Sequence, residues 1–335
     1  MQPWPRFIAF RIVRLALVLV AVALVAFALA KMSPVDPINA YLGPEIAKVG
    51  PEQRALIAAE WGLDQPVGVQ FTKWLGNLLA GDLGWSVTYN APVAEVIGTR
   101  FRTSLVLMGL AWIFSGLFGF ALGIVAGAWQ GGWADRLIRV YAYVLASTPT
   151  FWIAILLLMV FSVSLGWTPV CCAGPVGVLP EDVTLVERIR HLILPLAALS
   201  ILGIAQIALH TRAKMIEIMR SDYVLYAQAQ GASRLDIALR HGARNAALPA
   251  ITVLFASLGE LFGGSVLAEQ VFAYPGLGRA TIEAGIRGDV PLLLAITLFT
   301  TLFVSTGNTI ADALYRLVDP RMATADADAV QGAAP

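Results

Sequence analysis

Six long apolar runs constrain the fold of this chain more than any other feature. A helix needs about 20 apolar residues to cross the hydrocarbon core of a bilayer, and each run is of that order. Backbone polar groups in lipid must find partners within their own segment, so such runs form helices. We therefore expect an all-α polytopic membrane protein with six transmembrane helices. The expected spans are Ile12–Ala30, Ser104–Trp129, Ile138–Leu165, Leu192–Leu209, Leu248–Gln270 and Val290–Leu314.

The charge content agrees with a membrane protein. Only 13% of the residues are charged, whereas a soluble domain carries about 25%. The net charge of +1 gives no case for binding nucleic acid. The first run lacks a small-residue cleavage site and is followed directly by Lys31, so it is predicted to be a retained span rather than a removed signal peptide.

Basic residues predict the orientation in the membrane, because cytoplasmic loops carry an excess of Lys and Arg. With the N-terminus inside, the inner segments are basic overall and the outer ones acidic. Both termini and the segment Ser221–Ala250 are then cytoplasmic. The inner basic residues are Arg6, Arg11, Arg14, Arg136, Arg139, Arg212, Lys214, Arg220, Arg234, Arg240, Arg244, Arg316 and Arg321.

The boundaries divide the chain into a first helix (1–30), an external segment (31–103), a five-helix core (104–320) and a tail (321–335) expected to be disordered. The external segment is too long for a structureless loop, so we expect a small extracytoplasmic subdomain with a helix near Glu52–Trp61. It either binds an external protein or caps the first two spans.

Ser221–Ala250 is the only long polar, basic segment between apolar runs. A short helix is expected from Asp222 to Gln230, capped by Ser221 or Asp222 and ended by Gly231 in the left-handed conformation. A second helix is expected over Ser233–Asn245, and Pro249 would begin the next one. Two short helices bent at a glycine would form a knob able to transmit force.

This segment resembles the EAA loop of ABC-importer permeases, in the variant of the dipeptide/oligopeptide/nickel family. The resemblance implies that residues 212–248 are a coupling loop that docks on a separate ATPase subunit. Gln228 and Gln230 depart from the family, which has basic residues there. The alternative is an amphipathic loop lying on lipid. The matching residues are Asp222, Tyr223, Ala227, Ala229, Gly231, Arg240, His241, Arg244, Asn245 and Pro249.

Other motifs carry the same resemblance. Val271–Gly278 looks like the family's V-F-x-x-P-G-L-G sequence, which predicts an external turn at Pro275, Gly276 and Gly278. The third span contains Ser147 and Pro149 in a Ser-x-Pro-x-Phe motif that resembles the family's. Asn308 and Asp312 resemble the family's C-terminal pattern.

Four residues are candidates for the translocation path: Glu260, Ser147, Pro149 and Asn308. A carboxylate in a span costs a few kcal/mol unless it faces a cavity or a partner, so Glu260 either meets a substrate cation or forms a buried hydrogen bond. For Asp312 we expect an ion pair with Arg316, four residues later, rather than a proton relay.

Gly119, Gly123 and Gly127 recur every four residues in the second span, which predicts a seam of close helix packing, static or sliding. Cys171 and Cys172 are adjacent, and they form a disulfide with each other, pair elsewhere or remain thiols. They are too few for a disulfide scaffold or a zinc module.

The sequence contains no G-x-x-x-x-G-K-[ST] phosphate loop and no H-E-x-x-H, G-x-S-x-G or C-x-x-C motif, so it predicts neither an enzyme nor a cofactor in this chain. The resemblance implies a bacterial inner-membrane permease for peptides, with ATP and Mg on partner chains. Those partners would be a second homologous permease, two ATP-binding subunits and an external substrate-binding protein. Alternatives are a nickel or metal-chelate importer, an ion-gradient-driven transporter using Glu260 or Asp312, and a redox enzyme using the two cysteines.

Overall fold

The structure is a computed structural model that describes residues 4–32 and 50–318. The only strands in these residues form a two-stranded antiparallel hairpin. In chain order the elements are α1 (Trp4–Met32), α3 (Pro51–Trp61), α4 (Val67–Leu79), β1 (Trp85–Ser86), β2 (Ala91–Pro92), α5 (Val93–Ala128), α6 (Trp133–Ala146), α7 (Thr150–Leu157), the π-helical η2 (Leu158–Ser164), α8 (Leu185–Met219), α9 (Asp222–Ala229), α10 (Arg234–Asp236), the π-helical η3 (Ile237–Gly242), α11 (Ala243–Ala256), α12 (Leu258–Val271), α13 (Leu277–Arg287) and α14 (Val290–Val318).

The all-α polytopic architecture is confirmed. Among the described residues, four helices are long and apolar enough to cross a membrane, and there are six spans if each of two bent helix pairs counts as one. The pairs are α6 with α7–η2, and α11 with α12. The count of six therefore includes two broken helices.

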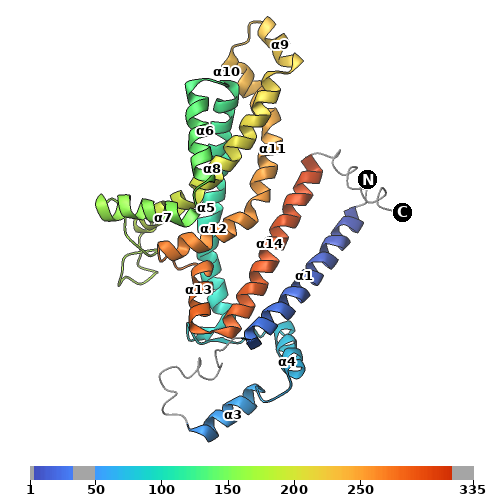
Figure 1. Ribbon diagram of the computed structural model, residues 1–335, viewed down its shortest axis with the longest axis vertical. Coiled ribbons are helices and arrows are strands. Elements are labelled where there is room, and N and C mark those ends of the chain that lie inside the picture. The colour runs from blue at the N-terminus through green and yellow to red at the C-terminus, as the bar shows by residue number, and fades with distance from the viewer. Residues whose placement is uncertain (1–3, 33–49, 319–335) are drawn as a thin grey trace.

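The expected span Ile138–Leu165 is not one continuous helix. The chain bends by 107° between α6 and the α7–η2 segment. Pro149 precedes α7 with φ of −60°, and a proline disfavours helical conformation in the residue before it, here Thr148. Figure 1 shows α7 projecting sideways from the bundle.

The span Leu248–Gln270 is bent by 48°. The bend lies at Ser257, which separates α11 from α12. The Ser257 hydroxyl donates a hydrogen bond of 2.8 Å to the carbonyl of Leu254, a side-chain contact that bends helices.

Helices α5 and α8 form the centre of the bundle, and the expected glycine seam joins them. A Cβ on Gly119, Gly123 or Gly127 would lie 2.8, 2.4 and 2.5 Å from the side chains of Ile207, Thr211 and Met215, respectively. Real Cβ atoms do not approach so closely, so only glycine permits this contact. The packing seam is confirmed, and its sliding stays a prediction.

The external segment is shorter than expected, because α5 already begins at Val93 instead of Ser104. The predicted helix near Glu52–Trp61 is confirmed as α3. Helix α4 was not expected. Its Phe71 and Trp74 pack on Phe27 of α1 at centroid distances of 5.2 and 5.5 Å. The rest of the proposed subdomain, residues 33–49, and the tail 321–335 lie outside the described residues.

The beginning of α1 and the end of α14 lie at the same end of the molecule. Arg11 of α1 forms an ion pair with Asp312 of α14. Asp312 therefore has a partner other than the expected Arg316, whose side chain lies outside the described part. Figure 1 shows α9 and α10 toward this end, and α3, α4 and α13 toward the opposite one.

Candidate functional site: a knob at one end of the bundle and a cavity within it

The knob begins with the short helix α9, as predicted. Ser221 occupies its N-cap position, but the Ser221 hydroxyl bonds to the carbonyl of Ile218 at 2.6 Å instead of capping α9. Gly231 follows α9 with φ of +85°, and its N–H donates to the carbonyl of Gln228 at 2.9 Å. The glycine therefore makes the sharp bend that the sequence predicted.

The second helix of the knob is longer than predicted. Ser233 caps it by accepting a 3.1 Å hydrogen bond from the N–H of Asp236. The chain then stays helical through η3 and α11 to Ala256, so Pro249 lies inside α11 and does not begin a helix. An interior proline costs about 3 kcal/mol. Ala246 and Ala250 on either side of Pro249 are buried, so packing against the bundle helps to hold the helix through the proline.

The knob is anchored to the bundle by a fully buried apolar contact. Val224, Ile237 and Ala246 pack with Ile218 near the end of α8. A Cβ on Gly242 would lie 2.3 Å from the terminal methyl of Met215. A close-packed contact of this kind can transmit strain between the knob and α8.

The opposite side of the knob is exposed and carries several large apolar side chains among polar and basic ones. Such exposed apolar patches mark protein or membrane contacts. Figure 1 shows α9 and α10 beyond the end of α6. The exposed large side chains are Tyr223, Leu225, Tyr226, Leu235 and Leu239.

The predicted coupling residues divide between this exposed side and the anchor. Ala227 packs in the anchor. Asn245 donates a 3.2 Å hydrogen bond to the hydroxyl oxygen of Tyr223, which ties α11 to α9. Arg240 pairs with Asp236 at 2.8 Å. The remaining exposed members are Asp222, Ala229, His241 and Arg244.

The external turn is wrapped around a carboxylate that the sequence analysis missed. Glu269 of α12 is fully buried. It accepts hydrogen bonds of 2.6 Å from the Ser104 hydroxyl and 3.1 Å from the N–H of Arg279. A Cβ on Gly276 would lie 2.2 Å from the carboxyl carbon, and one on Gly278 would lie 3.0 Å from a carboxyl oxygen. Gly276 is therefore required by Glu269, a second carboxylate in the span of Glu260, whereas Gly278 is required chiefly by Val266, whose Cα would lie 2.5 Å from a Cβ at position 278.

A second buried carboxylate joins the hairpin to the start of α14. Asp289 accepts hydrogen bonds from the Ser86 hydroxyl at 2.6 Å and from the N–H groups of Thr88 and Leu292 at 2.9 and 3.2 Å. The segment before α5 is thereby fixed to α14.

An ionic group lies beside this joint. Glu283 accepts hydrogen bonds from the Tyr89 hydroxyl at 2.6 Å and from Arg279 at 2.7 Å. Burial raises the pKa of the Glu283 carboxyl, but these hydrogen bonds and the nearby guanidinium charges outweigh it, so the net shift is downward. Burial, helped by the bond to Glu283, raises the pKa of Tyr89 to about 12. The carboxylate is therefore charged and the phenol neutral at physiological pH.

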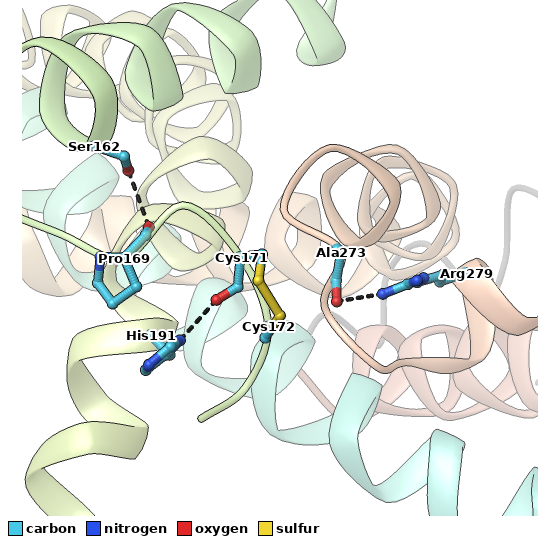
Figure 2. Close-up of a disulfide and its surroundings, with 7 residues drawn as sticks. All are labelled: Ser162, Pro169, Cys171, Cys172, His191, Ala273 and Arg279. Carbon is cyan, nitrogen blue, oxygen red and sulfur yellow. Dashed lines mark hydrogen bonds between the residues drawn. A yellow bond between two sulfur atoms is a disulfide. The ribbon is translucent and has the colours of Figure 1, made fainter. Parts of the chain in front are cut away.

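Cys171 and Cys172 form a disulfide with each other in the loop between η2 and α8. Figure 2 shows His191 of α8 donating from Nδ1 to the carbonyl of Cys171, a distance of 2.7 Å. The N–H of Cys172 donates to the carbonyl of Phe272 at 2.9 Å. The loop is thus joined to α8 and to the external turn.

Two of the four path candidates meet in one cavity. Pro149 and Glu260 both line a cavity of about 320 Å³. The cavity is bounded by the two bent helix pairs and by the helices α5 and α8. Ser147 and Asn308 do not line it, although all four candidates are exposed in the isolated chain. Gln206 of α8 was not a candidate, yet its Nε2 lies 3.2 Å from the Glu260 carboxylate.

Comparison with known proteins agrees with this architecture. The family described as "Binding-protein-dependent transport system inner membrane component" matches residues 119–324, and its N-terminal companion matches residues 5–109. A solved structure of the MetNI methionine ABC transporter superposes with a TM-score of 0.55 at 15% identity, covering 68% of this chain and 97% of that one.

Three relatives span nearly the whole chain. The oligopeptide transport system permease protein AppB of Bacillus subtilis is 34% identical over 91% of this chain and 95% of its own. The di/tripeptide permease DppB of Pseudomonas aeruginosa is 35% identical, with coverages of 94% and 98%. The glutathione permease GsiC of Salmonella paratyphi A is 34% identical, with coverages of 92% and 96%.

Long apolar helices, a knob anchored to one end of them and a cavity within the bundle define a membrane transport subunit. The chain belongs to the family of binding-protein-dependent transport system inner membrane components, the permeases of ABC importers.

Proposed function

We propose that this chain forms half of the translocation pathway for peptides and is driven by separate ATPase subunits through the knob. The names of the three relatives, which concern oligopeptides, di- and tripeptides, and glutathione, support a peptide-class substrate. Family membership speaks against an ion-gradient-driven transporter. The nickel or metal-chelate alternative has no such support among these relatives.

One observation carries the coupling role: the knob is buried against the bundle on one side and exposes several large apolar side chains on the other. Val224 and Ile237 are fully buried against the bundle, whereas Tyr226 and Leu239 are 67% and 58% exposed. The chain has no phosphate loop, so the energy must enter from another subunit. A protein docked on the exposed side would displace α8 through the buried side.

The proposal includes the remaining partners and the orientation. The family description implies a substrate-binding protein, and we place it at the end that carries α3, α4 and α13. A second homologous permease completes the pathway, and two ATP-binding subunits contact the knobs. The end with the knob, the beginning of α1 and the end of α14 faces the cytoplasm, as the basic residues predict.

Adding a charge to the exposed side tests the docking. Leu239→Glu should lower the amount of ATPase subunit that co-purifies with the permease by roughly tenfold or more, because a carboxylate would be desolvated in an apolar contact. Leu56→Glu makes the same change on α3, where Leu56 is 70% exposed, and should leave co-purification unchanged. Equal recovery of the ATPase with both variants would contradict the proposal.

A further inference from the structure

The cavity beside Glu260 lies where the bundle is broken twice. Residues from the α6–α7 bend and from the α11–α12 bend line it together with residues of α5 and α8. Irregular backbone at membrane depth is tolerated where it lines a cavity. Figure 1 shows α7, α8 and α12 meeting partway along α5. The polar lining residues are Ser115, Thr148, Thr150, Gln206, Ser257 and Glu260.

Glu260 has no counter-charge among residues 4–32 and 50–318. Its hydrogen-bond donor there is the side-chain amide of Gln206, and it forms no ion pair with a described basic side chain. The negative end of α6 and the positive end of α7 both lie at the cavity, so the two helix dipoles largely offset each other. The carboxylate therefore sets the sign of the electrostatic potential in the cavity.

We propose that Glu260 is a cation subsite that receives the terminal ammonium group of a peptide during its passage. This inference rests on the proposed function and deepens it. Gln206 donates a side-chain amide N–H to Glu260. The side-chain carbonyl oxygen of Gln206 therefore remains available as an acceptor. An ammonium group has three donors, which match the carboxylate, this carbonyl oxygen and a hydroxyl such as that of Ser257.

The size and composition of the cavity favour this occupant. Its volume of about 320 Å³ is at the lower end of the range for small-ligand pockets, so it accommodates the terminal residue of a peptide rather than a whole oligopeptide. Calcium prefers six or more oxygen ligands, several of them carboxylates, whereas Glu260 is the one carboxylate lining this cavity.

Substitutions that separate charge from shape test the proposal. Glu260→Asp keeps the charge and shortens the side chain, whereas Glu260→Gln keeps the shape and removes the charge. The variants are reconstituted with their partner subunits in proteoliposomes. Uptake of a defined mixture of di- to pentapeptides with free amino termini is read by mass spectrometry of the lumen. Glu95→Gln, at an exposed position on α5 outside the cavity, is the matched control.

We expect Glu260→Gln to lower uptake per ATP hydrolysed by roughly tenfold or more, the effect of losing one charge-assisted hydrogen bond. Glu260→Asp should retain more uptake than Glu260→Gln, and Glu95→Gln should match the wild type. Complex assembly and stimulated ATP hydrolysis should be normal in all three variants.

Two results would overturn the subsite. If uptake by Glu260→Gln equals that of the wild type, or exceeds that of Glu260→Asp, the charge is not needed and Glu260 serves only as a hydrogen-bonding group. If Glu260→Gln lowers recovery of the second permease together with uptake, Glu260 pairs with that subunit. Both results concern the variants and leave ATP-driven peptide uptake by the wild type unchanged. If the wild-type complex itself showed no such uptake, the proposed function would be contradicted instead.

Discussion

Replacing Gly231 with proline should abolish transport while leaving the permease in the membrane. Gly231 has φ of +85°, and proline is restricted to about −65°. The substitution also removes the N–H that bonds to the carbonyl of Gln228 at 2.9 Å. The bend between α9 and α10 must then open, and the exposed side of the knob changes shape. We expect background levels of peptide uptake and of substrate-stimulated ATP hydrolysis in reconstituted vesicles.

Gly231→Asn is the matched control for this prediction. Asparagine visits the left-handed region more readily than other non-glycine residues, and a Cβ at position 231 would meet no atom within 4 Å. This variant should keep most of its activity. Normal stimulated ATPase activity in the proline variant, with the protein correctly inserted, would count strongly against the coupling role of the bend.

The seam between α5 and α8 should not tolerate a single added methyl group at its centre. In Gly123→Ala the new Cβ would lie 2.4 Å from Cβ of Thr211 and 2.8 Å from the carbonyl oxygen of Ala208. The two helices must separate, at a cost of about 1–3 kcal/mol for overpacking. We expect a lower thermal denaturation midpoint of the purified complex and a several-fold loss of transport.

Gly109→Ala makes the same chemical change on the same helix. A Cβ at position 109 would meet no atom within 4 Å, and alanine is the better helix former by about 1 kcal/mol. The midpoint of this variant should equal or exceed that of the wild type. If the two alanine variants were equally stable, the close approach at Gly123 would not be required.

The sequence predicted the parts of the fold that depend on local physics. Apolar length identified the spans, and the spacing of Gly119, Gly123 and Gly127 identified the seam. Gly231 identified the bend in the knob. Each of these signals arises within one segment, where hydrophobicity or backbone conformation alone decides the outcome.

The parts that the sequence did not predict depend on contacts between distant segments. The apolar pattern runs across Ser257 without a break, so it carries no signal of the bend there. Pro249 continues its helix because tertiary burial outweighs a local helix breaker. The turn glycines Gly276 and Gly278 were recognised as a motif, but the close contacts that require them, with Glu269 and Val266, come from α12.

The candidate site was predicted well where its residues lie in one segment and poorly where they come from several. The coupling residues lie in one short segment, and the structure brings them together on the knob. The four path candidates came from three separate places, and only Pro149 and Glu260 share a cavity. Gln206 had no signal of its own, because a glutamine in an apolar helix becomes informative only when its neighbour is known.

The most direct test of the account is a photo-crosslink from position 226 in the actively transporting complex. A photoreactive amino acid replaces Tyr226, which is 67% exposed at the outer face of the knob, and peptide uptake is measured in the same vesicles. The account predicts a crosslink to the ATPase subunit whose yield changes when ATP is hydrolysed. Crosslinks to lipid alone, with peptide uptake undiminished, would contradict it.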